Sequence, residues 1–184
     1  NVSLGLSMDS ADPLMQVVNT LERVLPSLIG RVEHQRRQLA KNSSKVITTQ
    51  ALRQMVVNVA KGVSGIQYGA RPAPLDDVDL SDLGDVAKKW IGCFFDAFNA
   101  EIADREGSLA GSPAVLAAVG AMGHVILETA PDDREAMRSK VLASLRDVDW
   151  RKGEQWIGIA GTVKSKGFSV SGPKEAAYNI FAAL

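Results

Sequence analysis

The sequence predicts a mainly α-helical protein, a multi-helix bundle with one short β-hairpin near the C-terminus. Apolar residues recur at three- and four-residue spacing over most of the 184 residues, which is the period of an amphipathic helix. They make up 46% of the chain against 23% charged residues, the composition of a globular protein. We expect one helical domain over residues 1–184, with a weak internal break near 62–80, where glycines and prolines gather.

The N-terminal part is expected to hold two helices joined by a basic stretch. Asp12 suits the N-cap and Pro13 the first position of a helix over 13–28. The stretch 31–45 is polar and basic, with few apolar residues to bury. A second helix is expected over 49–62, where it ends at a glycine.

The middle of the chain predicts three more helices. The longest, over 81–102, carries Trp90 and further aromatic residues on one face. The next, over 113–128, is rich in alanine and glycine, and such thin surfaces leave room for large rings, so we expect these two helices to pack together. The last, over 131–146, has acidic residues in its first turn, where negative charge suits the helix dipole.

After Trp150 the spacing changes to that of strands. The segments 156–163 and 168–170 flank Lys164-Ser165-Lys166-Gly167, which predicts a β-hairpin. A last helix is expected over 173–184, after a glycine and a proline. Both tryptophans of this region should be buried, with each indole N–H bonded to an acceptor.

Residues 107–127 carry no formal charge, which raises the question of a membrane span. Their dense apolar part, 113–127, has 15 residues. At ~1.5 Å per residue it would reach about 22 Å, short of the ~30 Å hydrocarbon core. A buried central helix is therefore expected. The start of the chain shows no secretory signal pattern, so we expect a cytoplasmic protein with no membrane partner.

The net charge is zero, but it is unevenly distributed. Residues 1–74 hold nine Lys and Arg against four Asp and Glu, a net charge of +5, and residues 75–149 hold seven against fifteen, a net charge of −8. Residues 150–184 hold five against two, a net charge of +3. Two basic ends around an acidic middle indicate either charged partners or ends and middle that face each other within the fold.

Residues that commonly carry catalysis are scarce. His34 lies in the basic stretch, where a solvated side chain is expected, and His124 lies in an apolar helix, where a bonded core histidine is expected. Cys93 and two separated histidines give no zinc spacing, and the sequence contains no phosphate loop or nucleophile elbow. The acidic run 76–85 lacks the glycine and final glutamate of a calcium loop, and it suits the start of a helix. We therefore expect no catalytic residue, no metal and no cofactor.

Clustered cations are the strongest functional signal. Lys and Arg side chains can neutralise phosphates and release counterions, so such clusters indicate binding to a nucleic-acid backbone. The candidate DNA-binding residues are Arg31, Arg36, Arg37, Lys41 and Lys45 in the basic stretch, and Lys164 and Lys166 in the hairpin turn. No aromatic residues interleave with the basic stretch, so we expect contacts to phosphates rather than bases. The alternatives are a solvated connector and an ordinary polar turn.

Three sets of residues recur in an order that is typical of one family. They are the Asp9–Leu14 segment with Pro26 and Val32; Ser43–Thr48 with Ala51 and Leu52; and Asp149-Trp150-Arg151 with Trp156, Gly158, Gly161, Val163 and Lys166. In this order they resemble the C-terminal part of the DndB / DGQHR-domain family, which is associated with DNA sulfur modification. The third set is the most specific, because two tryptophans and two glycines recur at fixed offsets. Thr162 stands where the family shows Arg, so no DNA contact is assigned to it.

The resemblance implies an association with DNA and nothing catalytic. The Asp-Gly-Gln-His-Arg signature is absent from the 184 residues, so we expect the C-terminal fragment of a longer protein, with its N-terminal ParB-like half as a partner. DndB itself is a DNA-binding negative regulator of transcription, and members act in DNA-modification and defence operons. The implied function is therefore the helical portion of a DNA-binding regulator associated with DNA phosphorothioate modification.

Duplex DNA is the implied partner, and a second copy of the chain is a further candidate. Two alternative functions stay open. One is the non-catalytic half of a ParB-like DNA-processing enzyme. The other is a scaffold in a DNA-modification or defence system that binds partner proteins through the acidic middle.

Overall fold

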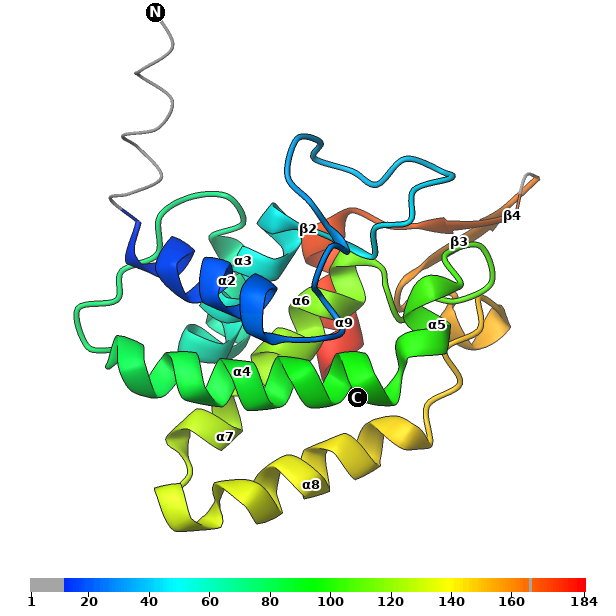
Figure 1. Cartoon of the computed structure of the whole chain (residues 1–184). Coiled ribbons are helices and arrows are strands. Elements are labelled where there is room, and N and C mark those ends of the chain that lie inside the picture. The colour runs from blue at the N-terminus through cyan, green and yellow to red at the C-terminus, as the bar shows by residue number, and fades with distance from the viewer. Residues whose placement is uncertain (1–11, 166) are drawn as a thin grey trace, which may run out of the picture.

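The structure is a computed structural model that describes residues 12–165 and 167–184. More than half of these residues are helical, and their strands form two short pairs, so the prediction of a mainly α protein with a C-terminal hairpin is confirmed (Figure 1). In chain order the elements are α2 (Pro13–Val24), β1 (Val32–Glu33), β2 (Ile47–Thr48), α3 (Thr49–Lys61), the 3₁₀ helix η1 (Gly62–Gln67), α4 (Leu80–Ala97), α5 (Asn99–Ala103), α6 (Pro113–Met122), α7 (His124–Glu128), η2 (Pro131–Asp133), α8 (Arg134–Arg146), η3 (Glu154–Trp156), β3 (Gly161–Lys164), β4 (Gly167–Val170) and α9 (Pro173–Ala183).

Helix α6 forms the centre of the fold. Its residues from Ala114 to Ala121 are buried, and it packs against both α3 and α9. Gly120 allows the close approach of α3, because a Cβ atom there would lie 2.8 Å from the Cα atom and the carbonyl oxygen of Met55. The expected buried central helix is therefore confirmed. Within the described residues, no helix is both long enough and apolar enough to span a membrane.

A buried asparagine joins α3 to α6. Asn58 is fully buried, and its Nδ2 donates to the carbonyl oxygen of Ala117 at 2.8 Å. Its Oδ1 accepts from Nε2 of Gln54 at 2.7 Å, and the same Nε2 donates to the carbonyl oxygen of Gly65 at 3.0 Å. Because a buried polar group without partners is costly, these bonds specify one register between α3, η1 and α6.

Trp90 connects α4 to the end of α6. Its indole N–H donates to the carbonyl oxygen of Val119 at 2.8 Å, and a Cβ atom on Gly123 would lie 2.4 Å from the ring. The expected packing of the aromatic helix on 113–128 is confirmed through Trp90 and through α7, whereas α6 packs most extensively against α3 and α9. Both predicted long helices are interrupted, at Phe98 and at Gly123.

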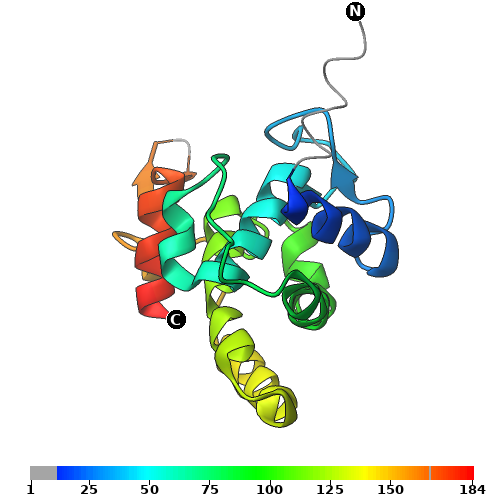
Figure 2. The same ribbon diagram turned by 90° about the vertical axis from the view of Figure 1, so that its left-hand side faces the viewer.

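Helix α8 lies at the foot of the molecule. Figure 2, in which α4 is seen end-on, shows α8 below α4 and the segments 31–45 and 161–170 at the top. Arg134 attaches the start of α8 to α4, since its Nη2 donates to Oδ2 of Asp82 at 2.9 Å. This hydrogen bond holds the pKa of Asp82 below its usual range.

The two ends of the basic stretch are joined by a short strand pair that the sequence did not indicate. β1 and β2 run parallel, with Val32 opposite Ile47 and Glu33 opposite Thr48. Strands of two residues have no alternating pattern to read. The pair turns the basic stretch into a closed loop, and β2 then leads directly into α3. We call residues 31–45 the basic loop.

The C-terminal hairpin is shorter than predicted. β3 and β4 pair antiparallel from Gly161 opposite Val170 to Lys164 opposite Gly167. The expectation of a strand over 156–160 is wrong, because η3 and a turn at Gly158, with φ +80°, occupy this segment. The tight turn lets the side chain of Trp156 enter the core.

Substitution of Gly120 tests the α3–α6 contact. We expect Gly120→Ala to lower the free energy of unfolding by about 1–3 kcal/mol, because the new methyl group would overlap the backbone of Met55. Gly84→Ala in α4 is the matched control, since a Cβ there meets nothing within 4 Å and alanine should stabilise the helix by ~0.5–1 kcal/mol. Urea denaturation measures both variants. Equal stability of the two would show that α3 and α6 are not closely packed at Gly120.

Candidate nucleic-acid interface

The basic loop and the hairpin lie on the same side of the molecule, at the top of Figures 1 and 2. They come from opposite ends of the chain. Together they contain all seven cations that the sequence marks as candidate DNA-binding residues, of which Lys166 lies outside the described residues. The fold therefore brings the two basic segments to one face, although no residue pattern indicated it.

Two of the candidate cations close the base of the basic loop. Arg31 Nη1 donates to the carbonyl oxygen of Ser27 at 3.2 Å and to Oδ1 of Asn99 at 2.7 Å. Lys45 Nζ donates to the carbonyl oxygen of Gly30 at 2.7 Å. The side chains of Arg31 and Lys45 are therefore engaged in shaping the loop.

The cations in the middle of the loop are exposed. Within the described part of the chain, no hydrogen bond or ion pair engages the side chain of Arg36 or Arg37. Lys41 Nζ lies 3.3 Å from Oε1 of Glu106, but the two side chains are 81% and 79% exposed, and such ion pairs contribute little. These three cations are available to a ligand.

The tip of the basic loop is held by Arg105, a residue that sequence reasoning missed. Its Nη1 donates to the carbonyl oxygen of Ala40 at 2.9 Å, and its Nη2 donates to the carbonyl oxygens of Lys41 at 2.8 Å and Ser43 at 3.0 Å. Arg105 lies in the acidic middle of the chain, more than 60 residues from the loop, and no local pattern marks it. Three hydrogen bonds from one guanidinium give the loop a fixed shape.

The hairpin presents its basic end to solvent. Lys164 ends β3 and is exposed, and the register places it opposite Gly167, whose φ of +106° suits a glycine at the turn. Thr162 and Val163 are exposed as well. The exposed part of β3 therefore carries two uncharged side chains and one cation, Lys164.

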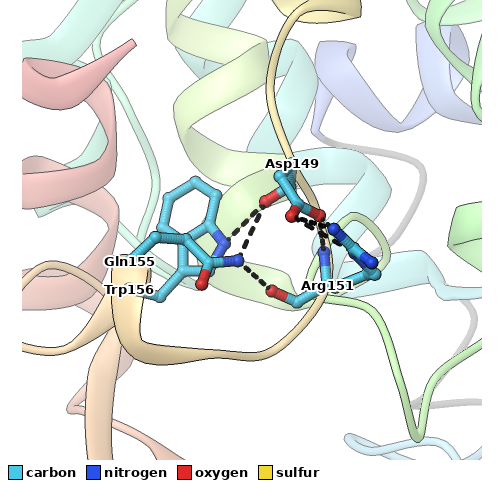
Figure 3. A network of polar contacts seen from close by, with 4 residues as sticks. All are labelled: Asp149, Arg151, Gln155 and Trp156. Atoms are coloured by element: carbon cyan, nitrogen blue, oxygen red, sulfur yellow. Dashed lines mark hydrogen bonds and ion pairs between the residues drawn. The ribbon is translucent and has the colours of Figure 1, made fainter.

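The segment from Asp149 to Trp156 is folded around its own polar groups (Figure 3). The Asp149 carboxylate accepts from the backbone N–H of Arg151 at 3.0 Å and from its Nη2 at 2.6 Å, and these bonds lower the pKa of Asp149 to about 2. The Asp149 carbonyl oxygen accepts from the indole N–H of Trp156 at 2.9 Å. Gln155 Nε2 donates to the Arg151 carbonyl oxygen at 2.6 Å.

The two tryptophans of this segment are buried as expected. The rings of Trp150 and Trp156 are stacked with centroids 5.8 Å apart, and Phe98 meets Trp150 edge-on at 5.9 Å. The expectation that each indole N–H finds an acceptor is confirmed for Trp156 and wrong for Trp150, whose Nε1 is buried without a partner among the described residues. Trp150 lies between aromatic rings, which supply packing but no strong acceptor.

Residues 149–156, which we call the tryptophan segment, support the basic loop through the backbone. Leu109 N–H donates to the carbonyl oxygen of Trp150 at 2.8 Å, and Lys152 N–H donates to that of Gly107 at 2.8 Å. Lys152 Nζ also donates to the carbonyl oxygen of Arg105 at 2.6 Å. The segment therefore fixes the turn that carries Arg105, which in turn holds the tip of the loop.

The charge asymmetry of the sequence is only partly compensated inside the fold. Among the described residues, ion pairs join the basic first part to the acidic middle at Lys41–Glu106 and at Lys61–Asp77. The expectation that basic and acidic parts face each other is therefore met at two places. The exposed arginines of the basic loop are not among them.

His34 is exposed as the sequence predicts, whereas His124 is bonded but only half-buried rather than in the core. His124 Nδ1 lies 2.9 Å from the carbonyl oxygen of Val59, so this half-buried ring is bonded as expected. His34 is exposed, and it bridges Oγ1 of Thr49 at 3.0 Å and Oε2 of Glu22 at 3.6 Å. Burial raises the pKa of Glu22 above its usual value. These contacts tie the start of the basic loop to α2 and α3.

The acidic run supports helices. Asp79 accepts from two backbone N–H groups of the first turn of α4 and caps it. Asp77 pairs with Lys61 at 2.7 Å, and Asp82 pairs with Arg134. Within the described residues, no three His, Cys, Asp or Glu side chains gather as a metal site requires.

Substitution of Trp156 tests the supporting role of this segment. We expect Trp156→Ala to lower the free energy of unfolding by about 3–5 kcal/mol, because it removes a buried ring. Trp156→Phe keeps most of the packing and should lower it by only about 1–2 kcal/mol, because the hydrogen bond to Asp149 is removed. Thermal and urea denaturation report both. An unchanged stability of Trp156→Ala would show that the ring is not a core element.

The comparisons with known proteins agree with the motif. The family model described as DndB, DNA-sulfur modification-associated, matches residues 1–179 of this chain. A search of curated proteins and a search of solved structures each found no match. The match covers the basic loop, the tryptophan segment and the hairpin. The chain therefore belongs to the DndB family, which is associated with DNA sulfur modification.

Proposed function

We propose that this protein is a cytoplasmic, DNA-binding regulator of transcription associated with DNA phosphorothioate modification, and that it holds duplex DNA by the sugar–phosphate backbone. Membership of a family associated with DNA sulfur modification supports DNA as the partner. The single observation that carries the proposal is the pair of exposed guanidinium groups of Arg36 and Arg37, for which the described residues supply no hydrogen-bond or ion-pair partner.

The contact surface consists of the middle of the basic loop and the end of the hairpin. Arg36, Arg37 and Lys41 supply charge from the loop, and Lys164 with Lys166 supplies it from the hairpin turn. Arg31 and Lys45 act at the base of the loop, where their side chains already bond to carbonyl oxygens. Two separated basic segments on one face suit the two phosphate chains that border a groove of the duplex.

We expect contacts to phosphates rather than bases, because the helices beneath this face are not free to enter a groove of DNA. Helices α3 and α6 begin below the loop, but both are packed in the core and cannot enter a groove of DNA. The loop itself offers cations without aromatic side chains between them. The surface therefore supplies charge and fixed shape without a base-reading helix.

A salt titration of duplex binding tests the proposal. We expect the affinity of the chain for a labelled duplex to fall steeply with salt and to depend little on base sequence. Replacing Arg36, Arg37 and Lys41 with Ala should lower the log–log salt slope by about 0.9 for each phosphate that is no longer neutralised. Replacing Lys164 and Lys166 should act in the same direction. Fluorescence anisotropy measures both slopes.

A matched control variant distinguishes the loss of this surface from the loss of net charge alone. Lys89, Lys140 and Arg146 are exposed on α4 and α8, outside both basic segments, and their replacement by Ala removes the same charge as the loop variant. The control should keep the parent slope. If both basic-segment variants keep the parent slope and affinity, neither segment holds DNA. If the parent binds no duplex even at low salt, binding to partner proteins becomes the better function for this chain.

A further inference from the structure

A cleft lies between the basic loop and the start of α9, and backbone contact with a duplex does not use it. Its volume is about 750 Å³, and it is lined by residues of the basic loop, α3, the end of η1 and the segment after it, α6 and α9. Cavities of ~300–1,000 Å³ are the usual size of small-molecule sites. Arg37 and Gln38 of the loop also line a second cleft of about 340 Å³ next to it.

We call the apolar part of the lining of the larger cleft its floor, and it is made of small groups. Ala70 and Ala117 line it, together with the rings of Pro113 and Pro173. Alanine methyl groups and proline rings leave a broad, shallow surface. Such a surface suits a flat ring system better than a branched aliphatic group, because a planar ligand can contact it over its whole face.

The mouth of the cleft is positively charged. Arg37 and Lys174 line it, against one carboxylate, that of Glu175, and Lys174 Nζ donates to the carbonyl oxygen of Gln67 at 2.7 Å, which holds its charge at this place. The N-terminus of α9 lies at the same place, and its N-cap, Gly172, supplies no side-chain acceptor to the first turn. Backbone N–H groups at a helix start and two cations together favour an anionic group on the ligand.

One polar residue of the cleft lining has a fixed orientation. Gln54 lines the cleft, and its Nε2 donates to Asn58 and to the carbonyl oxygen of Gly65. The orientation of the amide is fixed, because Asn58 uses its own Nδ2 on Ala117 and must accept through Oδ1. Gln54 Oε1 is thereby left buried and unpartnered among the described residues. This oxygen is shielded from solvent, so Gln54 helps to hold the shape of the cleft and is not counted as a ligand contact.

We propose that this cleft binds one nucleotide, with the base on the apolar floor and the phosphate at the mouth. A nucleotide combines a flat ring with a phosphate, which are the two properties that the apolar floor and the charged mouth select. The nucleotide comes either from solution or from an unpaired position of a DNA strand held by the basic loop. This inference goes beyond contact with the duplex backbone.

Calorimetric titration with dAMP and with deoxyadenosine tests the cleft directly. Ala70 is exposed in the segment after η1, so Ala70→Trp should fold normally and fill the cleft. We expect it to weaken dAMP binding at least about tenfold, a change of ~1.4 kcal/mol. Ala143→Trp on α8 is the matched control, since Ala143 is exposed far from the cleft. Lys174→Gln should weaken dAMP binding and leave deoxyadenosine binding unchanged.

Two DNA duplexes and the free nucleotide then distinguish a base of DNA from a nucleotide in solution as the ligand. The same variants are titrated with a perfect duplex, a duplex with one bulged adenine, and free dAMP. If Ala70→Trp weakens only dAMP binding, the ligand is a free nucleotide; if it also weakens binding of the bulged duplex, the cleft takes a base from DNA. Perfect-duplex binding should be unchanged in either case, which keeps this test separate from that of the basic loop. The proposal is overturned if the parent binds no dAMP or if Ala70→Trp and Ala143→Trp bind it equally.

Discussion

The close contact between α3 and α6 positions the candidate DNA-binding face. Gly120 brings the two helices together, and the buried side chain of Asn58 fixes how far along each other they lie. β2 leads directly into α3, so the end of the basic loop has the same fixed position. The starts of α3, α6 and α9 also line the cleft, whose shape therefore depends on the same contact. A wider helix spacing would move the loop and open the cleft together.

A second constraint acts on the tip of the basic loop. The tryptophan segment that carries the family resemblance is largely buried or bonded to itself, and it contributes no cation of the proposed contact surface. Its effect on the loop passes through the turn at 105–109 and the three hydrogen bonds of Arg105. The tryptophan part of the resemblance is thus architectural. The exposed cations depend on this segment for their position. A loop that is already held in one shape loses less conformational entropy on binding than a flexible loop would.

The sequence predicted where the main helices lie, because most have an apolar period and a recognisable start, but it did not predict the interruptions at Phe98 and Gly123. Asp12, Thr48, Asp79 and Ser112 each cap a helix with their side chains. The β1–β2 pair could not be predicted, because two residues have no period, and the 3₁₀ turn at Trp156 resembles a strand because it lies in an apolar run. The candidate cations were identified from their clustering alone. Arg105 and the cleft were not, because both depend on residues far apart in the chain.

Hydrogen–deuterium exchange with and without a duplex is the measurement that tests the central claim most directly, since it locates the contact without any substitution. Backbone amides of the basic loop and of the hairpin, residues 31–45 and 161–170, should exchange more slowly when a duplex is bound at low salt. Helix α8, residues 134–146, should exchange at the same rate in both states. Protection confined to α8, or a bound duplex that protects neither basic segment, would contradict the account.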